Sequence, residues 1–508
     1  MDRSRELKIG AVIAYTTIAI NIISGFIYTP WMVKQIGDSD YGLYTLANSL
    51  INLFLFDFGL SAATSRFVAK YLAEGRQDKA DCILGAIYKL YFIIDAVIMV
   101  VLAVVSFFLE DIYSNLTAFE IQRFRVVYIM SAFFALVNFP CVTFTGILNA
   151  YEKFITLKIA DALYRIFSVV ITIVALLCGG GLYALVCVHI IVGLLILAYK
   201  YCIIKTKTPV KINFAYKEKG IYRELFGFSI WVTVSTLAQR LIIGVTPSIL
   251  GVVSSSAAIA VFGIITVIEN YVHIITTALN GMFMPRIARI FTEKDYIKKL
   301  NSLIVMVGRL QFALNGLIVT GFFLLGRDFI QLWMGKSYSV AYYGILLVTV
   351  PNLFYNSMQI ANTALVVKNH VKIQAVTNVV VGIINVVVSF GLSKRYGVLG
   401  ACTAIFVAYN IRNIGYFIAY YKILKLNIKK VIKECYLAIG IPILITIALG
   451  IGLNHIFLNC DWTSIITKAG IIVVCYFVLI FVFGLSRDER KKIKGMLQKR
   501  IFFRGKKS

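Results

Sequence analysis

Uninterrupted apolar runs of about 20 residues recur along the whole chain, and they constrain its fold more than any other feature. A helix of this length crosses roughly 30 Å of hydrocarbon. Hydrophobic residues make up 60% of the 508 residues and charged residues only 15%, a composition typical of integral membrane proteins. The sequence lacks the alternating short-strand pattern of an outer-membrane barrel, so the spans are expected to be helices.

The apolar runs predict fourteen membrane spans. The first is too long for the core of a signal peptide and leads straight into the second, so we expect it to remain in the mature protein. The predicted spans lie near residues 9–33, 42–65, 83–108, 124–148, 155–178, 182–204, 224–250, 257–283, 302–325, 341–367, 371–392, 397–421, 432–453 and 465–485.

The distribution of basic residues predicts the topology. If the N-terminus is cytoplasmic, most of the 51 Lys and Arg residues fall in the inner segments, as the positive-inside rule requires. The outer loops then hold only Lys34, Arg123, Arg125, Arg327, Lys336, Lys394, Arg395 and Lys468. We therefore expect both termini to be cytoplasmic. Because the basic residues gather in alternate loops, membrane topology accounts for the net charge of +27, and no nucleic-acid partner is expected.

The chain is predicted to be an all-α integral membrane protein. Its longest inner linker separates two six-helix lobes, and a C-terminal helix pair follows the second lobe. The predicted parts are an N-terminal lobe at 1–204, a basic cytoplasmic linker at 205–223, a C-terminal lobe at 224–421, an extra helix pair at 422–485 and a basic cytoplasmic tail at 486–508.

Cysteine and histidine patterns indicate no metal site. The nine cysteines are scattered singly, without a CxxC pair, and the four histidines show no HExxH spacing. Buried apolar packing is the preferred interpretation of the cysteines. We therefore predict neither a metal nor an organic cofactor.

Polar residues inside the predicted spans form stripes at helical periodicity, and such residues are expected to face away from lipid. One interpretation is a polar cavity; the alternative is hydrogen bonding between helices, at roughly 0.6 kcal/mol each. The stripes contain Asn21 in the first span, Asn48, Asn52 and Arg66 in the second, Thr233, Thr236 and Arg240 in the seventh, Glu269 and Asn280 in the eighth, and Asn352, Asn356 and Gln359 in the tenth.

Charged residues near the centres of spans are the strongest candidates for function. Arg240 and Glu269 could form a fixed ion pair, but we favour a hydrated cavity in which a guanidinium binds phosphate in bidentate fashion. Asp95 could bind a coupling proton or cation, or pair with a neighbouring helix. Asp57 falls on the opposite face from the Asn48 stripe, so a structural role is expected. Arg412 can snorkel towards the cytoplasmic side, with phosphate binding as a secondary hypothesis.

The first hairpin carries a recognisable motif. It contains Ile36-Gly37, then Tyr41-Gly42-Leu43-Tyr44, then Asp57-Phe58-Gly59-Leu60 and Arg66-Phe67-Val68-Ala69, with a weaker echo at Met284-Pro285-Arg286. This pattern resembles the polysaccharide transporter family, the Wzx-type oligosaccharide-lipid flippases of the MOP superfamily, which also contains MurJ and the MATE exporters. Span one has no basic residue after Lys8, unlike the MurJ-like proteins, which disfavours a lipid II substrate.

The resemblance implies a flippase in the bacterial inner membrane. It would move undecaprenyl-diphosphate-linked oligosaccharide from the cytoplasmic to the outer leaflet by alternating access, for the synthesis of O-antigen, lipopolysaccharide, capsule or exopolysaccharide. The diphosphate would bind Arg240, with Arg66 and Arg412, while the stripes of Asn, Thr and Gln residues would contact sugar hydroxyls. A proton or sodium ion at Glu269 or Asp95 would couple transport. Membrane lipids and glycan polymerase machinery are the expected partners.

Two other classes of protein remain as alternatives. A MATE-like cation-coupled exporter of drugs or metabolites would need an anionic cavity to bind organic cations. The central Arg240 argues against such a cavity. A polytopic glycan polymerase or ligase would need substrate-binding outer loops, whereas those predicted here are short and show no catalytic constellation. The chain is therefore not expected to be an enzyme.

Overall fold

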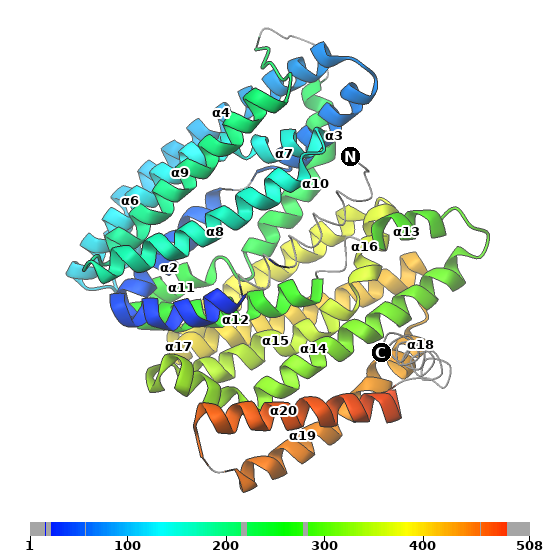
Figure 1. The fold of residues 1–508 in the computed structure, drawn as a ribbon. Coiled ribbons are helices and arrows are strands. Elements are labelled where there is room, and N and C mark those ends of the chain that lie inside the picture. The colour runs from blue at the N-terminus through cyan, green and yellow to red at the C-terminus, as the bar shows by residue number, and fades with distance from the viewer. Residues whose placement is uncertain are drawn as a thin grey trace, which may run out of the picture. The chain divides into compact units, whose positions relative to one another are not determined.

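A computed structural model describes residue 16 and residues 22–55, 57–214, 221–277, 283–457 and 459–484, without the side chains of residues 221–229, 232 and 285. Regular structure in these residues is helical throughout (Figure 1), which confirms the all-α prediction. The chain forms two compact units. The first unit is Met1–Thr266 with Val371–Ala408, and the second is Val267–His370 with Tyr409–Ser508.

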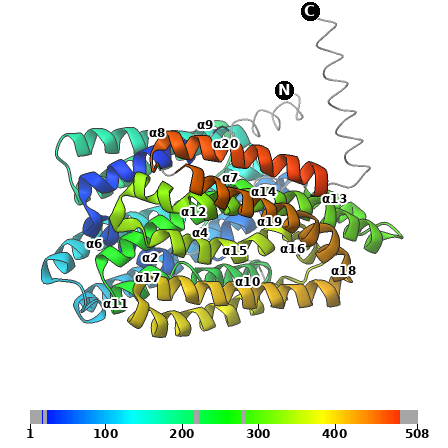
Figure 2. The same cartoon turned by 90° about the horizontal axis from the view of Figure 1, so that it is seen from below.

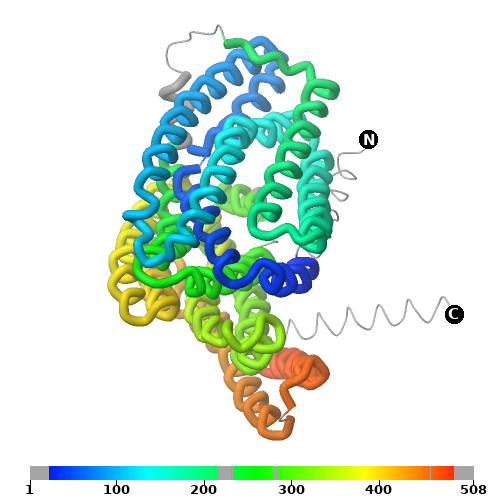
Figure 3. Tube along the Cα trace, turned by 90° about the vertical axis from the view of Figure 1, so that its left-hand side faces the viewer, coloured from blue at the N-terminus to red at the C-terminus, as the bar shows by residue number. Residues whose placement is uncertain are grey.

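The first unit is a bundle of long and broken helices (Figure 3). In it α4 packs on α6, α6 on α9, and α8 on α9, the last pair around buried Ala160 and Val192. After a helix at residues 22–36, its elements are α2 (Asp38–Phe54), α3 (Leu60–Ala73), α4 (Gln77–Phe107), α5 (Leu109–Ile112), α6 (Ala118–Cys141), α7 (Thr143–Ala150), α8 (Phe154–Leu177), α9 (Leu182–Lys207), α10 (Ile221–Arg240), α11 (Thr246–Val253), the start of α12 (Ser256–Thr277) and the first part of α17 (Val371–Leu424).

The second unit is built on α14, against which α15, α19 and α20 pack (Figure 2). Leu324 and Leu325 of α14 are buried against Ile472 of α20. With the ends of α12 and α17, its elements are α13 (Met284–Ile290), α14 (Tyr296–Met334), the short 3-10 helix Lys336–Tyr338, α15 (Ala341–Ser357), α16 (Gln359–Val367), α18 (Ile428–Val431), a π-helix (Ile432–Leu437), α19 (Ala438–Ile456), α20 (Trp462–Leu479) and a second π-helix (Ile480–Gly484).

Nine helical segments of the described residues are long and apolar enough to cross a membrane. Their apolar stretches are only 17% to 56% buried within the protein, because large side chains such as Phe107 and Leu444 face outward. A water-soluble protein would not leave so much apolar surface exposed. The protein is therefore a multi-pass membrane protein.

The helix α17 contains two of the predicted spans. At 54 residues it would extend for about 80 Å if straight, more than twice the hydrocarbon thickness. It is interrupted at Gly397, where φ is 54°. A Cβ on Gly400 would clash with the carbonyl oxygen of Leu392, whereas eight residues of straight helix advance about 12 Å. The chain therefore folds back at Gly397, as the separate spans 371–392 and 397–421 predict.

Four other predicted spans are each two helices rather than one in the described residues. The span predicted at 42–65 breaks between α2 and α3, the span at 124–148 between α6 and α7, the span at 224–250 between α10 and α11, and the span at 341–367 between α15 and α16. The first of these breaks has positive φ angles at Phe58 (50°) and Gly59 (69°). The predicted stripes assumed continuous helices, so the alignments that cross these breaks were wrong. Residues 9–15 and 17–21 of the first predicted span lie outside the described residues.

The first hairpin is tighter than predicted. The sequence suggests a loop at Gly37-Asp38-Ser39-Asp40, but helix resumes at Asp38 and only Gly37, with φ of 87°, interrupts it. The side chains around this turn are tied to α6. Asp40 pairs with Arg123 at 2.5 Å, and Glu120 accepts hydrogen bonds from Ser39 and from Ser256 at the start of α12.

Candidate functional site

Two broken helices lie side by side in the first unit. The helix α2 packs on α11, and α3 packs on α10, so the pair α2–α3 runs antiparallel to the pair α10–α11. The hydroxyl of Ser49, in the second half of α2, donates to the carbonyl of Gly244 in the second break. Helix breaks leave backbone groups that helix hydrogen bonds no longer satisfy.

The break after α10 is supported by α17. The side-chain amide of Asn385 donates to the carbonyls of Leu241 (3.1 Å) and Ile242 (2.8 Å), two groups that the end of α10 leaves exposed. Asn385 is itself fully buried. Inside a membrane these carbonyls have no other source of hydrogen bonds, so Asn385 stabilises the break.

The break between α2 and α3 is a turn capped by Asp57. Its carboxylate accepts a hydrogen bond from the backbone N–H of Gly59 at 2.7 Å, and its carbonyl accepts from Leu60 at 2.8 Å. Positive φ at Gly59 costs little because glycine has no Cβ. The motif Asp57-Phe58-Gly59-Leu60 therefore encodes a break in the middle of a membrane span.

Each break carries one charge, and the charges have opposite signs. Arg240 is the last residue of α10 and is half-buried, and its Nη1 atom is buried without a hydrogen-bond partner among the described atoms. Asp57 lies close enough to Arg240 for its charge to act on the guanidinium. The predicted structural role of Asp57 is present, because its carboxylate caps the turn at Gly59. Its effect on Arg240 is a second role, which the sequence analysis did not predict.

A separate cavity of about 180 Å³ opens in the first unit beside α2. Asn48 and Asn52 line it, as do Asn138 and His189, two polar residues that the sequence analysis missed. Asn48 also donates to the carbonyl of Tyr44 at 3.0 Å, and Tyr44 stacks on His189 with ring centroids 6.0 Å apart. The expected grouping of Asn48 and Asn52 is therefore present, but on α2 alone: Arg66 lies on α3, beyond the break.

In the second unit three predicted residues meet in one buried network. The Nδ2 of Asn352 donates to Glu269 at 3.0 Å, and its Oδ1 accepts from Arg412 at 2.9 Å. The guanidinium of Arg412 is stacked by two rings, 3.9 Å from the centroid of Tyr355 and 4.1 Å from that of Tyr409. Arg412 is only 6% exposed, so it does not snorkel as the sequence suggested. Glu269 thus has its cationic neighbour, Arg412, within its own unit.

The remaining predicted residues are dispersed. Thr233 is buried on α10 while Thr236 is exposed, and Asn356 at the end of α15 is 1% exposed, with Gln359 beyond the next break. Asp95 on α4 is half-buried, and its Oδ1 has no donor among the described atoms. Asn21 and Asn280 lie outside the described residues. Within the described part of the chain, no three His, Cys, Asp or Glu residues form a group that could hold a metal ion.

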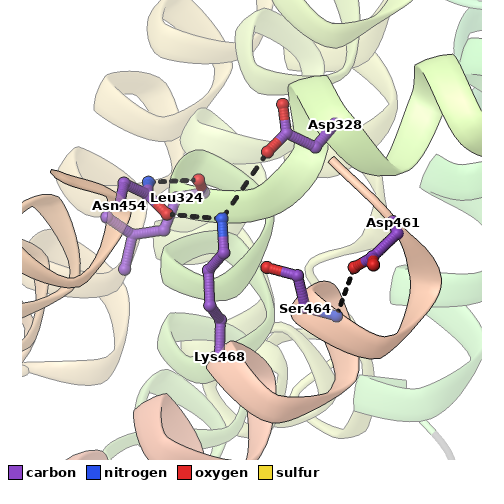
Figure 4. A network of polar contacts seen from close by, with 6 residues as sticks. All are labelled: Leu324, Asp328, Asn454, Asp461, Ser464 and Lys468. Carbon is purple, nitrogen blue, oxygen red and sulfur yellow. Dashed lines mark hydrogen bonds and ion pairs between the residues drawn. The ribbon is translucent and has the colours of Figure 1, made fainter. Parts of the chain in front are cut away.

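The sequence analysis also missed a polar network that joins the C-terminal helix pair to α14 (Figure 4). Lys468 of α20 is 2% exposed, with its Nζ 3.3 Å from Asn454 Oδ1 and 3.8 Å from Asp328. Asn454 in turn donates to the carbonyl of Leu324 at 3.0 Å. The sequence assigned Lys468 to an outer loop, although its position after the N-cap Asp461 places it in the second turn of a helix.

These features define a class of protein: a multi-pass helical membrane protein with two opposite charges, Asp57 and Arg240, at breaks in its membrane helices, as in many transporters. A family model described as "Polysaccharide biosynthesis protein" matches residues 8–291, more than half of the chain. The chain therefore belongs to the polysaccharide biosynthesis protein family, as the motifs of the first hairpin predicted.

Solved structures show the fold. The lipid II flippase MurJ in an inward closed conformation is similar with a TM-score of 0.72 at 14% identity, covering 94% of this chain and 98% of that chain. An inward-facing multidrug resistance MATE family transporter of the MOP superfamily has a TM-score of 0.69 at 11% identity, covering 82% and 98%. A MOP superfamily transporter from Pyrococcus furiosus has a TM-score of 0.58 at 13% identity, covering 83% and 95%. No curated protein matches the sequence.

Proposed function

We propose that the protein is a flippase for a diphosphate-linked oligosaccharide lipid, which it moves from the cytoplasmic to the outer leaflet of the bacterial plasma membrane. Membership of the polysaccharide biosynthesis family supports a glycan substrate, and the MurJ-like fold supports a lipid carrier. In this proposal fourteen spans form two six-helix lobes and a C-terminal pair, with both termini cytoplasmic. A product destined for O-antigen, capsule or exopolysaccharide is consistent with the family.

The observation that carries the proposal is the state of Arg240. A guanidinium inside a membrane span is costly, by about 2.5–3.5 kcal/mol on insertion scales, and is retained where it has a function. Its Nη1 has no acceptor among the described atoms, so it can donate to a phosphate oxygen without first losing a hydrogen bond. Arginine matches phosphate geometry with two parallel hydrogen bonds.

Asp57 gives this site a mechanism. When no substrate is bound, its carboxylate is the counter-charge of Arg240. A bound diphosphate takes over that role and brings a second negative charge close to Asp57, which favours separation of the two helix breaks. A ligand shifts a conformational equilibrium only through its differential affinity for the two states, and the exchange of Asp57 for phosphate supplies such a difference.

The cavity at Asn48 and Asn52 is suited to hydroxyl groups. Its amide, imidazole and hydroxyl side chains can donate and accept hydrogen bonds, and Tyr44 and Phe134 supply apolar and aromatic surface of the kind that packs on sugar rings. Asn48, Asn52 and His189 are therefore our candidates for sugar contacts. A proton or sodium ion at Asp95 or Glu269 would bias the return of the empty carrier.

The test is complementation of a strain that lacks its flippase, with surface polysaccharide as the readout. Arg240→Ala and Arg240→Lys should abolish or sharply reduce it, because lysine cannot reproduce the bidentate contact. Arg125→Ala is the matched control, since Arg125 pairs with Glu110 on the exposed surface. Normal polysaccharide from Arg240→Ala at a normal protein level would refute the assignment.

The fold similarity to a MATE transporter supports a second candidate, a cation-coupled exporter of drugs or metabolites. Its organic cation would bind Asp57 or Asp95 rather than Arg240. Accumulation of a fluorescent cationic dye distinguishes the two: the exporter lowers accumulation and needs the carboxylates, whereas the flippase leaves it unchanged.

A further inference from the structure

A basic pocket of about 530 Å³ lies in the second unit where α13 meets the beginning of α14. Arg286 and Arg289 on α13 and Lys299 on α14 line it, together with Glu293. Arg286 and Arg289 are three residues apart, so they project from the same face of the helix. Both side chains are exposed and reach solvent at the mouth of the pocket.

The charges in this pocket are not balanced. Glu293 is the acidic residue of the lining, and its carboxylate is paired with Lys299. That pair is neutral overall, which leaves the positive charges of Arg286 and Arg289 for a ligand. Two guanidinium groups on one helical face bind a phosphate through several charge-assisted hydrogen bonds.

Apart from Ser302, the rest of the pocket lining is apolar, which a free anion would not require. Ile290, Leu303 and Met306 form this apolar wall. Along α14 the apolar surface continues outward, with Met306 47% and Leu310 51% exposed. Because α14 is a candidate membrane span, this exposed strip faces hydrocarbon, and Lys299 to Leu310 extends about 16 Å along it. The pocket thus combines a site for a charged headgroup with a track for an acyl chain.

We propose that this pocket binds an anionic membrane lipid, with the lipid phosphate on Arg286 and Arg289 and the acyl chains along Met306 and Leu310. The proposal stands apart from the transport function, because it concerns one face of the second unit and none of the residues assigned to substrate. Such a bound lipid would hold α13 against the beginning of α14 at the level of the headgroups.

The experiment uses the purified full chain in nanodiscs of phosphatidylcholine with increasing phosphatidylglycerol, with bound lipid counted by native mass spectrometry. One basic residue near a membrane surface contributes about 1 kcal/mol to anionic lipid binding, so Arg286→Gln and Arg289→Gln should each weaken it about 5-fold and the double variant about 30-fold. Glu293→Gln should strengthen binding about 5-fold, because it releases the charge of Lys299.

The matched control is Lys294→Gln with Lys298→Gln. It removes the same charge from the same exposed segment but from outside the pocket lining. Unchanged phosphatidylglycerol binding in this control supports the pocket, whereas an equal loss shows that diffuse surface charge is responsible and overturns the proposal.

Two further measurements distinguish a membrane lipid from free phosphate as the ligand. Full competition by millimolar inorganic phosphate would overturn a lipid site in favour of a free-anion site. Met306→Asn should weaken phosphatidylglycerol binding at least 3-fold, because it places a polar amide on the acyl track. Equal phosphatidylglycerol binding by Met306→Asn and the unmodified chain would contradict the acyl track.

Discussion

The arginines of the two units are held in opposite ways. In the second unit Arg412 is stacked between two tyrosine rings and bonded to Asn352, whose amide also binds Glu269. In the first unit Arg240 sits at a helix break, where the charge of Asp57 acts on it and its Nη1 has no hydrogen-bond partner among the described atoms. One cation is immobilised by its own unit, and we propose that the other serves a ligand.

The difference between these two arginines indicates how a structural charge inside a membrane can be distinguished from a functional one. A buried ion whose partners are all internal is costly to disrupt, because removing one partner leaves the other uncompensated. An ion with an unused hydrogen-bond donor contributes less to stability and more to binding. Four predictions test this distinction, from the largest expected effect to the smallest.

Replacing Arg412 should damage folding more than any other change considered. Arg412→Gln leaves Glu269 buried without its cation, at a cost of about 3–5 kcal/mol. Thermal unfolding of the purified protein measures the loss, and Arg240→Gln is the comparison, with an expected change below about 1 kcal/mol. Equal destabilisation by the two variants would remove the distinction between the arginines.

Removing the charge of Asp57 should tighten headgroup binding while slowing transport. Asp57→Asn eliminates the competitor for Arg240, so farnesyl diphosphate should bind about tenfold more tightly, equivalent to about 1.4 kcal/mol. Surface polysaccharide should fall, because bound substrate no longer changes the partner of Arg240. Asp78→Asn, on the exposed face of α4, serves as the control. Weaker binding by Asp57→Asn would contradict the exchange mechanism.

Disrupting the support of the α10 break should have an intermediate effect. Asn385→Leu keeps the side-chain volume but leaves the carbonyls of Leu241 and Ile242 unbonded, at a cost of about 1–3 kcal/mol. Because Arg240 precedes these residues directly, transport should decline along with the thermal midpoint. Asn385→Ala, which also removes the amide donor, should lose at least as much; a stable Asn385→Ala variant would argue against this role.

Replacing Lys468 should have the smallest effect on stability. This buried cation differs from both arginines. Its partner Asp328 keeps 36% of its side chain exposed, so that carboxylate remains solvated when the lysine is removed. Lys468→Met should therefore change stability by less than about 1 kcal/mol, because methionine fills a similar volume and the charge left behind is partly exposed to solvent. Limited proteolysis of α19–α20 is the readout, and rapid cleavage would show that the network is essential.

The sequence predicted the regular parts of the molecule and missed the irregular ones. Apolar runs and the hairpin motif were sufficient for the helical class and the family, because both depend on local sequence. The helix breaks were missed because hydropathy is continuous through Asp57-Phe58-Gly59 and through Gly244. The glycines there, and Pro247 after the second break, were the available signals.

Side-chain partners were harder to predict than positions. The sequence analysis singled out Arg240 and Glu269, but the opposite charges that act on them, Asp57 and Arg412, lie far from them in sequence. Asn352 was recognised as polar, yet its bridge between Glu269 and Arg412 depends on how three helices meet. Such contacts are properties of tertiary packing, which periodicity within one helix does not contain.

The π-helix at Ile432–Leu437 sets the rotation of the helix that follows it. A π-turn accommodates one more residue than an α-turn. Deleting one residue there would restore α-helical winding but rotate everything that follows by about 100°. Asn454 would then turn away from Leu324 and Lys468. The polar network of the last helix pair therefore depends on one extra residue in a turn that lies about 20 residues before it in the sequence.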